Sequence, residues 1–310
     1  MNYTMYHLHS DYSLLDSCTN YKEYIDYAVS LRQKAIAFTE HGKPMGWVTK
    51  KKYCDEKGIK YIHGVECYLT EKLLWDNSEK IRDNYHTILI AKNFKGLLEI
   101  NELISRSTDK DHTYYHNRVS FDEFLQLSNN IITISACLAS PVNKLDINNP
   151  MYEKLVKRYD YLEIQSHNCQ EQKDFNTHLA IMSNKYHKPL IVGTDTHSLN
   201  KYKAECRKIL LKYKDRSYGD EDKYDLTYQT YDELVNAFII QDTLPKNIYL
   251  QAIENTNVMA DSIEDFELDK SLKYPILYGT REKDKEMFHK TIEDKFKHKV
   301  ENNIIYPEQV

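Results

Sequence analysis

The sequence predicts an α/β fold in which a mostly parallel sheet closes, or nearly closes, into a barrel. Short apolar runs alternate with helical patterns along roughly the first 225 residues. This alternation is typical of parallel strands joined by crossover helices. A chain of 310 residues also leaves room for one large α/β domain and a smaller appendage.

Seven apolar runs are the predicted strands, and they span residues 5–9, 35–39, 61–69, 86–91, 131–135, 161–165 and 190–193. Helical patterns fall between them, at 20–33, 45–56, 94–106, 121–127 and 170–186, and Gly58 ends the second of these helices. After about residue 225 only helices are expected, at 231–240 and 246–262, with Pro245 between them. We therefore expect a barrel over 1–225, a helical extension over 226–270, and a charged tail over 271–310 that includes a solvated helix at 283–299.

Composition restricts the classes of protein that fit. No run approaches the length of a membrane span, and the N-terminus lacks the basic and apolar regions of a signal peptide, so we expect a cytoplasmic protein with no membrane partner. Six cysteines show no CxxC pair, which predicts reduced thiols. The net charge of −5 argues against tight binding of nucleic acid over the whole surface.

Residues of metal-ligand type stand near the ends of several predicted strands. His7 and His9 are two positions apart in the first strand, so their side chains point the same way. His41, Glu66, Cys137 and Asp195 follow other apolar runs, and in such barrels the chemistry gathers at the C-terminal ends of strands. His86 instead precedes its strand, so either this strand is antiparallel to its neighbours or the barrel is distorted.

A series of short motifs carries a family resemblance. The motifs are HLHSDYSLLDS, TEHG, GVE, YHTILIAKN, RVSFDEF, SACLAS, YLEIQSH and GTDTHSL, in this order along the chain. Together they resemble the PHP (polymerase and histidinol phosphatase) domain, in particular that of the alpha subunit of bacterial DNA polymerase III. The resemblance covers roughly residues 3–265 and includes the helical segment that follows the domain in that subunit. The tail from Lys273 is at best similar to the beginning of the polymerase palm, and we expect that this chain is not itself a polymerase.

The resemblance implies a distorted (βα)7 barrel with a trinuclear centre of divalent transition metals, and catalytic roles for Glu66, Asp195 and His197. Matched motif to motif, the first metal would be held by His7, His9, Glu66 and Asp195, the second by Glu66, His86 and Cys137, and the third by Asp16, His41 and His197. This mixture of imidazole, carboxylate and thiolate suits Zn²⁺, Mn²⁺ or Fe²⁺ and is too rich in nitrogen for Mg²⁺. Glu40 departs from the family, in which Asp is usual.

Other polar residues allow two interpretations each. His167 follows a strand and could support a ligand or contact substrate, and Arg118 could hold a phosphate or be solvated at the surface. Asp11 is either a partner of the ligands or an exposed turn residue. His112 and His116 lie in a polar stretch that predicts exposure, and His63 is expected to be a packing residue.

Three functions fit the sequence. The first is a free-standing metal-dependent phosphoesterase, either a 3′→5′ exonuclease on single-stranded nucleic acid ends or a phosphatase on a small phosphorylated metabolite or nucleotide. The second is a separately encoded accessory or proofreading module of a DNA polymerase III that needs a polymerase partner. The third is a metal-stabilised scaffold without catalysis.

Overall fold

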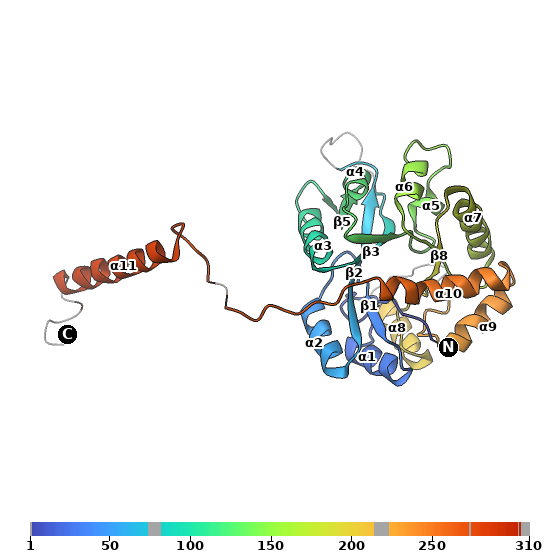
Figure 1. Cartoon of the computed structure of the whole chain (residues 1–310), viewed down its shortest axis with the longest axis horizontal. Coiled ribbons are helices and arrows are strands. Elements are labelled where there is room, and N and C mark those ends of the chain that lie inside the picture. The colour runs from blue at the N-terminus through green and yellow to red at the C-terminus, as the bar shows by residue number, and fades with distance from the viewer. Residues whose placement is uncertain (1, 74–81, 214–222, 273, 303, 305–310) are drawn as a thin grey trace. The chain divides into compact units, whose positions relative to one another are not determined.

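The computed structural model describes the chain except residues 1, 74–81, 214–222, 273, 303 and 305–310. The chain divides into two compact units, Met1–Phe266 and Glu267–Val310. The first unit is a mixed α/β fold that contains every strand of the described residues (Figure 1). The α/β prediction is therefore confirmed.

Two sheets form the framework of the first unit. The larger sheet contains β1 (Ala35–Phe38), β2 (Lys60–Thr70), β3 (Tyr85–Ala91), β4 (Thr113–Tyr114), β5 (His116–Ser120) and β6 (Ile131–Ile134). Its order is β4-β5-β2-β3-β6, and β1 pairs with β2. A second sheet holds β7 (Leu162–Ile164) and β8 (Leu190–Val192) as a parallel pair.

The strand β3, which carries His86 as its second residue, is antiparallel to both of its neighbours. β3 pairs in this sense with β2 on one side and with β6 on the other, whereas β1 and β5 are parallel to β2. The first of the two alternatives for this strand is confirmed. Its reversed direction places His86 at the same edge of the sheet as Tyr68, its partner in β2.

The prediction of a first strand at residues 5–9 is wrong, because these residues form no regular strand. Residues 5–9 make only single bridges, between Met5 and Ile36 and between Leu8 and Thr196. The segment divides its hydrogen bonds between two neighbours: Ala37 donates to the carbonyl of Met5, and Thr196 donates to that of His7. Another single bridge, from Ile134 to Tyr161, links β6 to the start of β7. Within the described residues the continuous ladders do not close into a ring, and these bridges provide the remaining links.

Ten helices of the described residues belong to the first unit. They are α1 (Tyr21–Ser30), α2 (Trp47–Lys57), α3 (Phe94–Ser107), α4 (Phe121–Leu125), α5 (Pro141–Lys144), α6 (Tyr152–Arg158), α7 (Gln170–Tyr186), α8 (Lys201–Tyr213), α9 (Tyr231–Gln241) and α10 (Lys246–Asp261). Local chemistry sets several ends: a capping box of Asn20 and Glu23 begins α1, and Gly58, in the left-handed conformation, ends α2. The sequence missed α5 and α6, which are short, and α8, which buries only Arg207 and Leu211.

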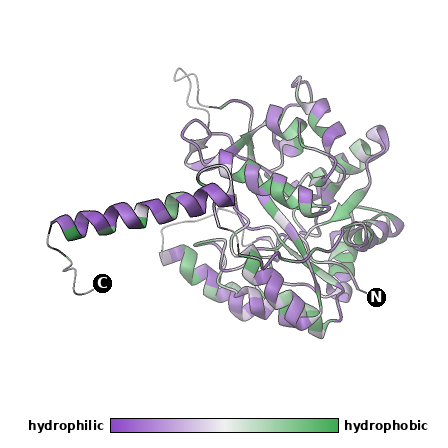
Figure 2. Cartoon of the chain, turned by 60° about the vertical axis from the view of Figure 1, so that its left-hand side comes forward, coloured by the Kyte–Doolittle hydropathy of each residue, from purple (hydrophilic) through white to green (hydrophobic). Residues whose placement is uncertain are grey.

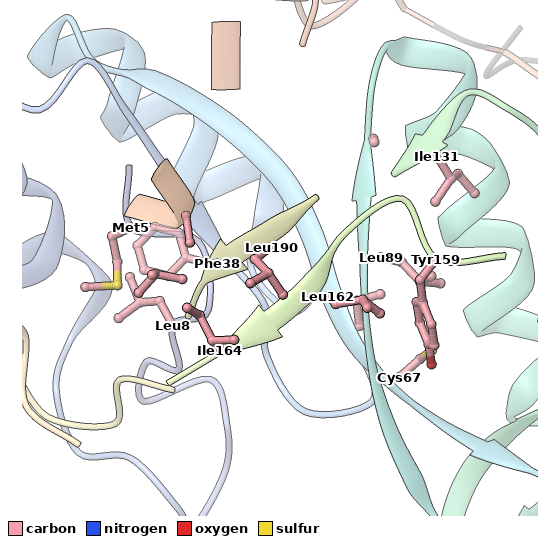
Figure 3. Packing of buried hydrophobic residues seen from close by; sticks show 14 of the residues in the cluster. Met5, Leu8, Phe38, Cys67, Leu89, Ile131, Tyr159, Leu162, Ile164 and Leu190 are labelled. Atoms are coloured by element: carbon pink, nitrogen blue, oxygen red, sulfur yellow. The ribbon is translucent and has the colours of Figure 1, made fainter. Parts of the chain in front are cut away.

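The hydrophobic core joins the N-terminal segment to both sheets. Met5 and Leu8 share one cluster with Phe38 of β1 and with Ile164 and Leu190 of β7 and β8 (Figure 3). This packing holds residues 5–9 between the two sheets even though they form no regular strand. The functional residues of that segment are therefore fixed by the core.

The helical extension packs on the same unit. On α10, Asn255 donates a hydrogen bond of 2.7 Å to the carbonyl of Leu190 at the start of β8. On α9, Gln241 is buried and donates to the carbonyls of Gln165 and His167. The division at residue 225 remains a prediction, but both helices belong to the compact unit that carries the strands.

The second unit contains α11 (Arg281–Glu301). None of its described residues is buried, and its surface is mostly hydrophilic (Figure 2). The predicted helix at 283–299 is confirmed. No helix of the described residues is both long enough and apolar enough to cross a membrane.

Candidate metal centre

Four of the predicted ligands converge on one point. Nε2 of His7 lies 3.1 Å from Oε2 of Glu66 and 3.1 Å from Oδ1 of Asp195. Nε2 of His9 lies 3.1 and 3.3 Å from the same two oxygens. One ligand atom from each residue lies within 4.8 Å of every other, which is an arrangement that one cation can bridge.

The second oxygen of Glu66 faces a different group. Its Oε1 lies 2.5 Å from Nδ1 of His86 and 3.5 Å from Nδ1 of His41. Sγ of Cys137 lies 3.5 Å from Nδ1 of His86. Glu66 is fully buried in β2, so the strand fixes a carboxylate between two sets of ligand atoms.

The remaining predicted ligands form a third group. Oδ2 of Asp16 lies 2.7 Å from Nε2 of His41 and 3.1 Å from Nε2 of His197. The ring of His9 stacks on both imidazoles, with centroid separations of 4.0 Å to His41 and 4.3 Å to His197. The fold thus brings all nine predicted ligand residues into one continuous cluster.

The buried donor atoms of this cluster fit divalent cations. Nε2 of His9, Nδ1 of His41, Oε1 of Glu66 and Oδ1 of Asp195 are buried without a hydrogen bond of acceptable geometry, although ionisable neighbours lie close to each. Leaving buried polar atoms unsatisfied destabilises a protein. Coordination of metal ions would satisfy these atoms, and the donor set of nitrogen, oxygen and sulfur suits Zn²⁺, Mn²⁺ or Fe²⁺.

The cluster also holds its carboxylates ionised. Burial alone would raise the pKa of Glu66, but His86 and His41 hold it well below its usual value. Burial likewise opposes ionisation of Asp195, and His7 and His197 keep its pKa well below the usual range. The imidazoles thus supply positive charge that metal ions would replace, so protons and metal ions should compete for this site.

The pKa values of His7 and Cys137 also indicate that protons and metal ions compete for the cluster. Although burial opposes the charged form of His7, the carboxylates of Glu163 and Asp195 raise its pKa well above its usual value. Burial, together with Asp195 and Glu66, raises the pKa of the Cys137 thiol well above its usual value. A bound cation reverses these preferences because metal ligands must be deprotonated.

The sequence analysis did not identify Glu163, which contacts the ring nitrogen of His7 that does not face Glu66. Its Oε1 lies 2.7 Å from Nδ1 of His7, and Tyr6 and Gln165 each donate to its carboxylate at 2.8 Å. A Cβ added to Gly193 would lie 2.2 Å from the carboxylate, so this glycine makes the room that Glu163 occupies. The sequence did contain a signal for this role, because Glu163 is an acidic residue between Leu162 and Ile164 in an apolar run.

A second buried chain of contacts supports His9. Nδ1 of His9 lies 3.1 Å from the hydroxyl of Ser13, which donates to Oε2 of Glu40 at 2.5 Å. Nζ of Lys50 lies 2.5 Å from Oε1 of Glu40, and both side chains are buried. Glu40 also accepts from the backbone and hydroxyl of Ser10, so its extra methylene relative to the usual Asp serves this network. Metal-ligating imidazoles generally need such a partner on the second nitrogen.

Asp16 has a partner that the sequence did not indicate. Arg207 of α8 contacts Oδ1 of Asp16 at 2.5 Å and donates through Nε to the Asp16 carbonyl at 2.6 Å. This leaves Oδ2 directed at His41 and His197. No motif pointed to α8, because Arg207 stands alone in a polar helix.

The predicted supporting residues have mixed outcomes. Arg118 is buried and paired with Asp83 at 3.2 Å, so its interpretation as a solvated surface residue is wrong. Asp11 is half-buried and accepts from Asn20 at 2.9 Å, and its role as a partner of the ligands remains a prediction. His167 is buried, and this burial lowers its pKa to about 4; its role as a supporting or substrate residue remains a prediction.

Two further histidines were assigned from local composition. His112 is buried between Asp111 and Glu123, so its predicted exposure is wrong. One of the polar neighbours that suggested solvent, Asp111, is in fact an ion-pair partner. His63 is buried against Tyr61 and Asn101, as a packing residue should be.

Comparisons with known proteins give a family and several relatives. The PHP domain model matches residues 5–167, which is more than half of the chain. DNA polymerase III subunit alpha of Borreliella burgdorferi is 29% identical over 279 residues, covering 84% of this chain and 24% of that protein. The subunit of Treponema pallidum is 31% identical over 223 residues, covering 68% of this chain and 19% of that protein. The chain thus spans a quarter or less of these relatives.

Among solved structures, endonuclease Q in complex with a 27-mer duplex bearing an abasic lesion shows a weak similarity. The TM-score is 0.39 with 14% identity, covering 64% of this chain and 50% of that chain. A similarity at this level supports no conclusion about the present chain.

Proposed function

Because the chain belongs to the PHP domain family, we propose that it is a metal-dependent phosphoesterase that hydrolyses phosphodiester bonds. The observation that carries this proposal is the convergence of nine ligand-type side chains, four of which, His9, His41, Glu66 and Asp195, bring a buried donor atom without a hydrogen bond. We further propose that the strands form the distorted (βα)7 barrel of the family. The single bridges at Met5, Leu8 and Ile134 support this, because they link neighbouring strands where the ladders stop.

In this proposal each group of side chains holds one ion. His7, His9 and Asp195 would hold the first ion together with Glu66, whose second oxygen faces the group of His86 and Cys137. Asp16, His41 and His197 would hold the third ion. When bound, divalent metal ions lower the pKa of a water molecule and neutralise charge on a phosphoryl group.

The side chains of this cluster have three roles in the proposal. Glu66 would contribute to the sites of two neighbouring ions, because each of its oxygens faces a different set of ligands. Asp195 and His197 come a few residues after β8, and they contact His7 and Asp16 of the N-terminal segment and so complete the cluster. Glu163 and Ser13 orient the two N-terminal imidazoles.

For the substrate we propose the 3′ end of single-stranded nucleic acid, degraded stepwise without sequence preference. The relatives named above are subunits of a DNA polymerase, and this supports nucleic acid as the class of substrate. A metal cluster recognises the phosphodiester that all nucleotides share, so no base readout is required.

A labelled oligonucleotide tests both parts of the proposal. The protein is loaded with Mn²⁺ or Zn²⁺, incubated with a 5′-labelled single strand, and the products are resolved by length. A descending ladder is expected. Scattered internal fragments would indicate an endonuclease, and an intact strand beside rapid phosphate release from a small monoester would favour a metabolite phosphatase.

A second proposal is that the chain is an accessory module of a separately encoded polymerase, on which its activity depends. The similarity to DNA polymerase III alpha covers 84% of this chain and so extends beyond the residues that match the family model. A module that needs such a partner should be nearly inert alone and become active when a polymerase III body is added. An independent enzyme should turn over substrate by itself.

A further inference from the structure

We infer that a strip of aromatic side chains beside the metal cluster is a stacking platform for the bases of single-stranded nucleic acid. The strip consists of Tyr68, His116, Tyr114 and Tyr115, and Arg82 lies against its last member. The inference rests on the proposed function, because it assigns the substrate's nucleotides to a surface next to the same site.

The register of the strands places most of this aromatic strip on the face that carries Glu66. Tyr68 is two residues beyond Glu66 in β2, so the two side chains share a face. Tyr68 pairs with Arg118 of β5, and His116 lies two residues before Arg118. His116 in turn pairs with Tyr114 of β4. The same face therefore runs from the proposed bridging carboxylate across three strands to Tyr114.

Ring contacts connect the aromatic strip to the ligands. The ring of Tyr68 stacks on His41 with a centroid separation of 6.3 Å and an interplanar angle of 18°. It also lies 5.1 Å from the ring of His86 and 5.0 Å from that of His116. Tyr68 is buried, whereas His116 is exposed, so the contacts lead from the interior of the site to solvent.

The outer end of the aromatic strip is built to expose a ring. Tyr115 occupies the tight turn between β4 and β5 with φ of 60°, a left-handed conformation that is uncommon for a bulky residue. Its side chain is 71% exposed, and its ring lies 4.7 Å from that of Tyr114. Strained backbone of this kind clusters at functional sites, where a particular side chain is needed despite the strain.

Arg82 adds a positive charge at the same place. Its guanidinium lies 4.5 Å from the centroid of the Tyr115 ring, and Nη2 donates to the Tyr115 hydroxyl at 2.8 Å. Aromatic rings interleaved with cationic groups are the usual surface for single strands, because bases stack on the rings and phosphates meet the cations. A strand whose terminal phosphodiester lies in the cluster would continue along this face.

Two substitutions of Tyr115 separate an effect on base stacking from an effect on folding. Tyr115→Asn removes the ring, and Asn tolerates a left-handed backbone, so the protein should unfold at the same or a higher temperature. Tyr115→Phe keeps the ring and loses only the hydroxyl. Tyr202→Ala removes a tyrosine of similar exposure, 73%, from α8 and is the matched control.

The test measures binding and turnover separately on the full chain. Binding of a fluorescent single-stranded phosphorothioate oligothymidine, which resists hydrolysis, is followed by anisotropy with the metal-loaded protein. Turnover with Mn²⁺ is measured on the unmodified strand and on bis(p-nitrophenyl) phosphate, a small diester with no nucleobase. Tyr115→Asn should weaken binding by about 5- to 100-fold. It should lower kcat/KM for the strand, relative to that for the small diester, by a similar factor.

Tyr115→Phe and Tyr202→Ala should bind the strand within about twofold of the wild type, because neither removes a ring of the strip. The inference is overturned if Tyr115→Asn binds the strand as the wild type does, or if the wild type hydrolyses the small diester without binding the strand. Binding that depends on Tyr115 in a protein that hydrolyses neither substrate would refute the proposed function and leave the platform in place.

Discussion

Replacing Glu163 by Gln should weaken metal binding without changing any ligand. Gln keeps the shape of Glu but loses the charge that faces Nδ1 of His7 at 2.7 Å. The carboxylate is fully buried and accepts from Tyr6 and Gln165, so water cannot replace what is lost. His7 would then lose the partner that directs its Nε2 toward Glu66 and Asp195.

The expected loss of metal affinity follows from what a carboxylate paired with a metal-ligating imidazole contributes in other proteins. Removal of the carboxylate behind a metal-ligating imidazole weakens metal binding about 10- to 100-fold, which is about 1.4–2.8 kcal/mol. In the metal-free protein, breaking a buried pair by removing one partner costs about 3–5 kcal/mol. Glu163→Gln should therefore lower both the metal affinity and the stability of the metal-free protein.

Chelator competition measures the first effect, and urea unfolding in the presence of a chelator measures the second. Glu153→Gln is the matched control, because this carboxylate lies on the surface of α6 in a pair with Lys157. A metal affinity of Glu163→Gln within twofold of the wild type would refute the assignment of Glu163 as a positioning residue.

Gly193→Ala perturbs the same contact by a different route. The new Cβ would lie 2.2 Å from the Glu163 carboxylate, which is held by three partners and cannot move without breaking their hydrogen bonds. Overpacking of this kind costs about 1–3 kcal/mol. Metal affinity should fall as it does in Glu163→Gln, and a loss of stability with unchanged metal affinity would contradict the link between these residues.

Further predictions test the cluster and the framework around it. Glu66→Gln should leave the fold intact and reduce phosphodiester hydrolysis by orders of magnitude, and near-normal turnover would place the chemistry elsewhere. Elemental analysis should find about two to three transition-metal ions per chain, and chelation should lower the unfolding temperature; unchanged stability without metal would argue against the centre. Lys50→Met should destabilise the protein by about 3–5 kcal/mol, because it leaves the buried Glu40 carboxylate unpaired, and a urea midpoint equal to that of the wild type would contradict this. Burial opposes a charged His112, but its two carboxylate neighbours raise its pKa, so its stabilising contribution should be complete below pH of about 6.5 and vanish as the pH rises through the folded-state value. His112→Gln should accordingly destabilise the protein at pH 5.5 more than at pH 9, and an equal loss at both would refute the ion pairs.

The sequence predicted the elements that local patterns specify. Apolar runs located six of the eight strands of the described residues, and the expected position of His86 ahead of an apolar run raised the antiparallel alternative that the structure has. The hairpin of β4 and β5 was missed because Thr113–Tyr114 is too short and polar to form a pattern. Residues 5–9 read as a strand because their alternation is genuine, whereas their pairing with two different neighbours depends on the tertiary fold.

The residues of the candidate site also divide into those that the sequence predicted and those that it did not. The nine ligand positions could be named because motifs preserve residue type and order, and the fold brings them together. Glu163, Arg207 and the Glu40–Lys50 pair could not be named with a role, because each acts through a partner distant in sequence. The aromatic strip escaped notice for a related reason, since its members come from three strands and only their register aligns them.

The spread of the ligands along the chain, from His7 to His197 with Arg207 behind Asp16, has a consequence for synthesis on the ribosome. About two hundred residues must emerge before the first histidines meet the last ones, and closing so long a loop is entropically unfavourable until the intervening core has packed. The nascent chain should therefore be unable to capture its full metal complement until α8 has left the ribosome. Complete metal binding would then follow the synthesis of most of the first unit, so a shorter nascent chain would lack the complete cluster.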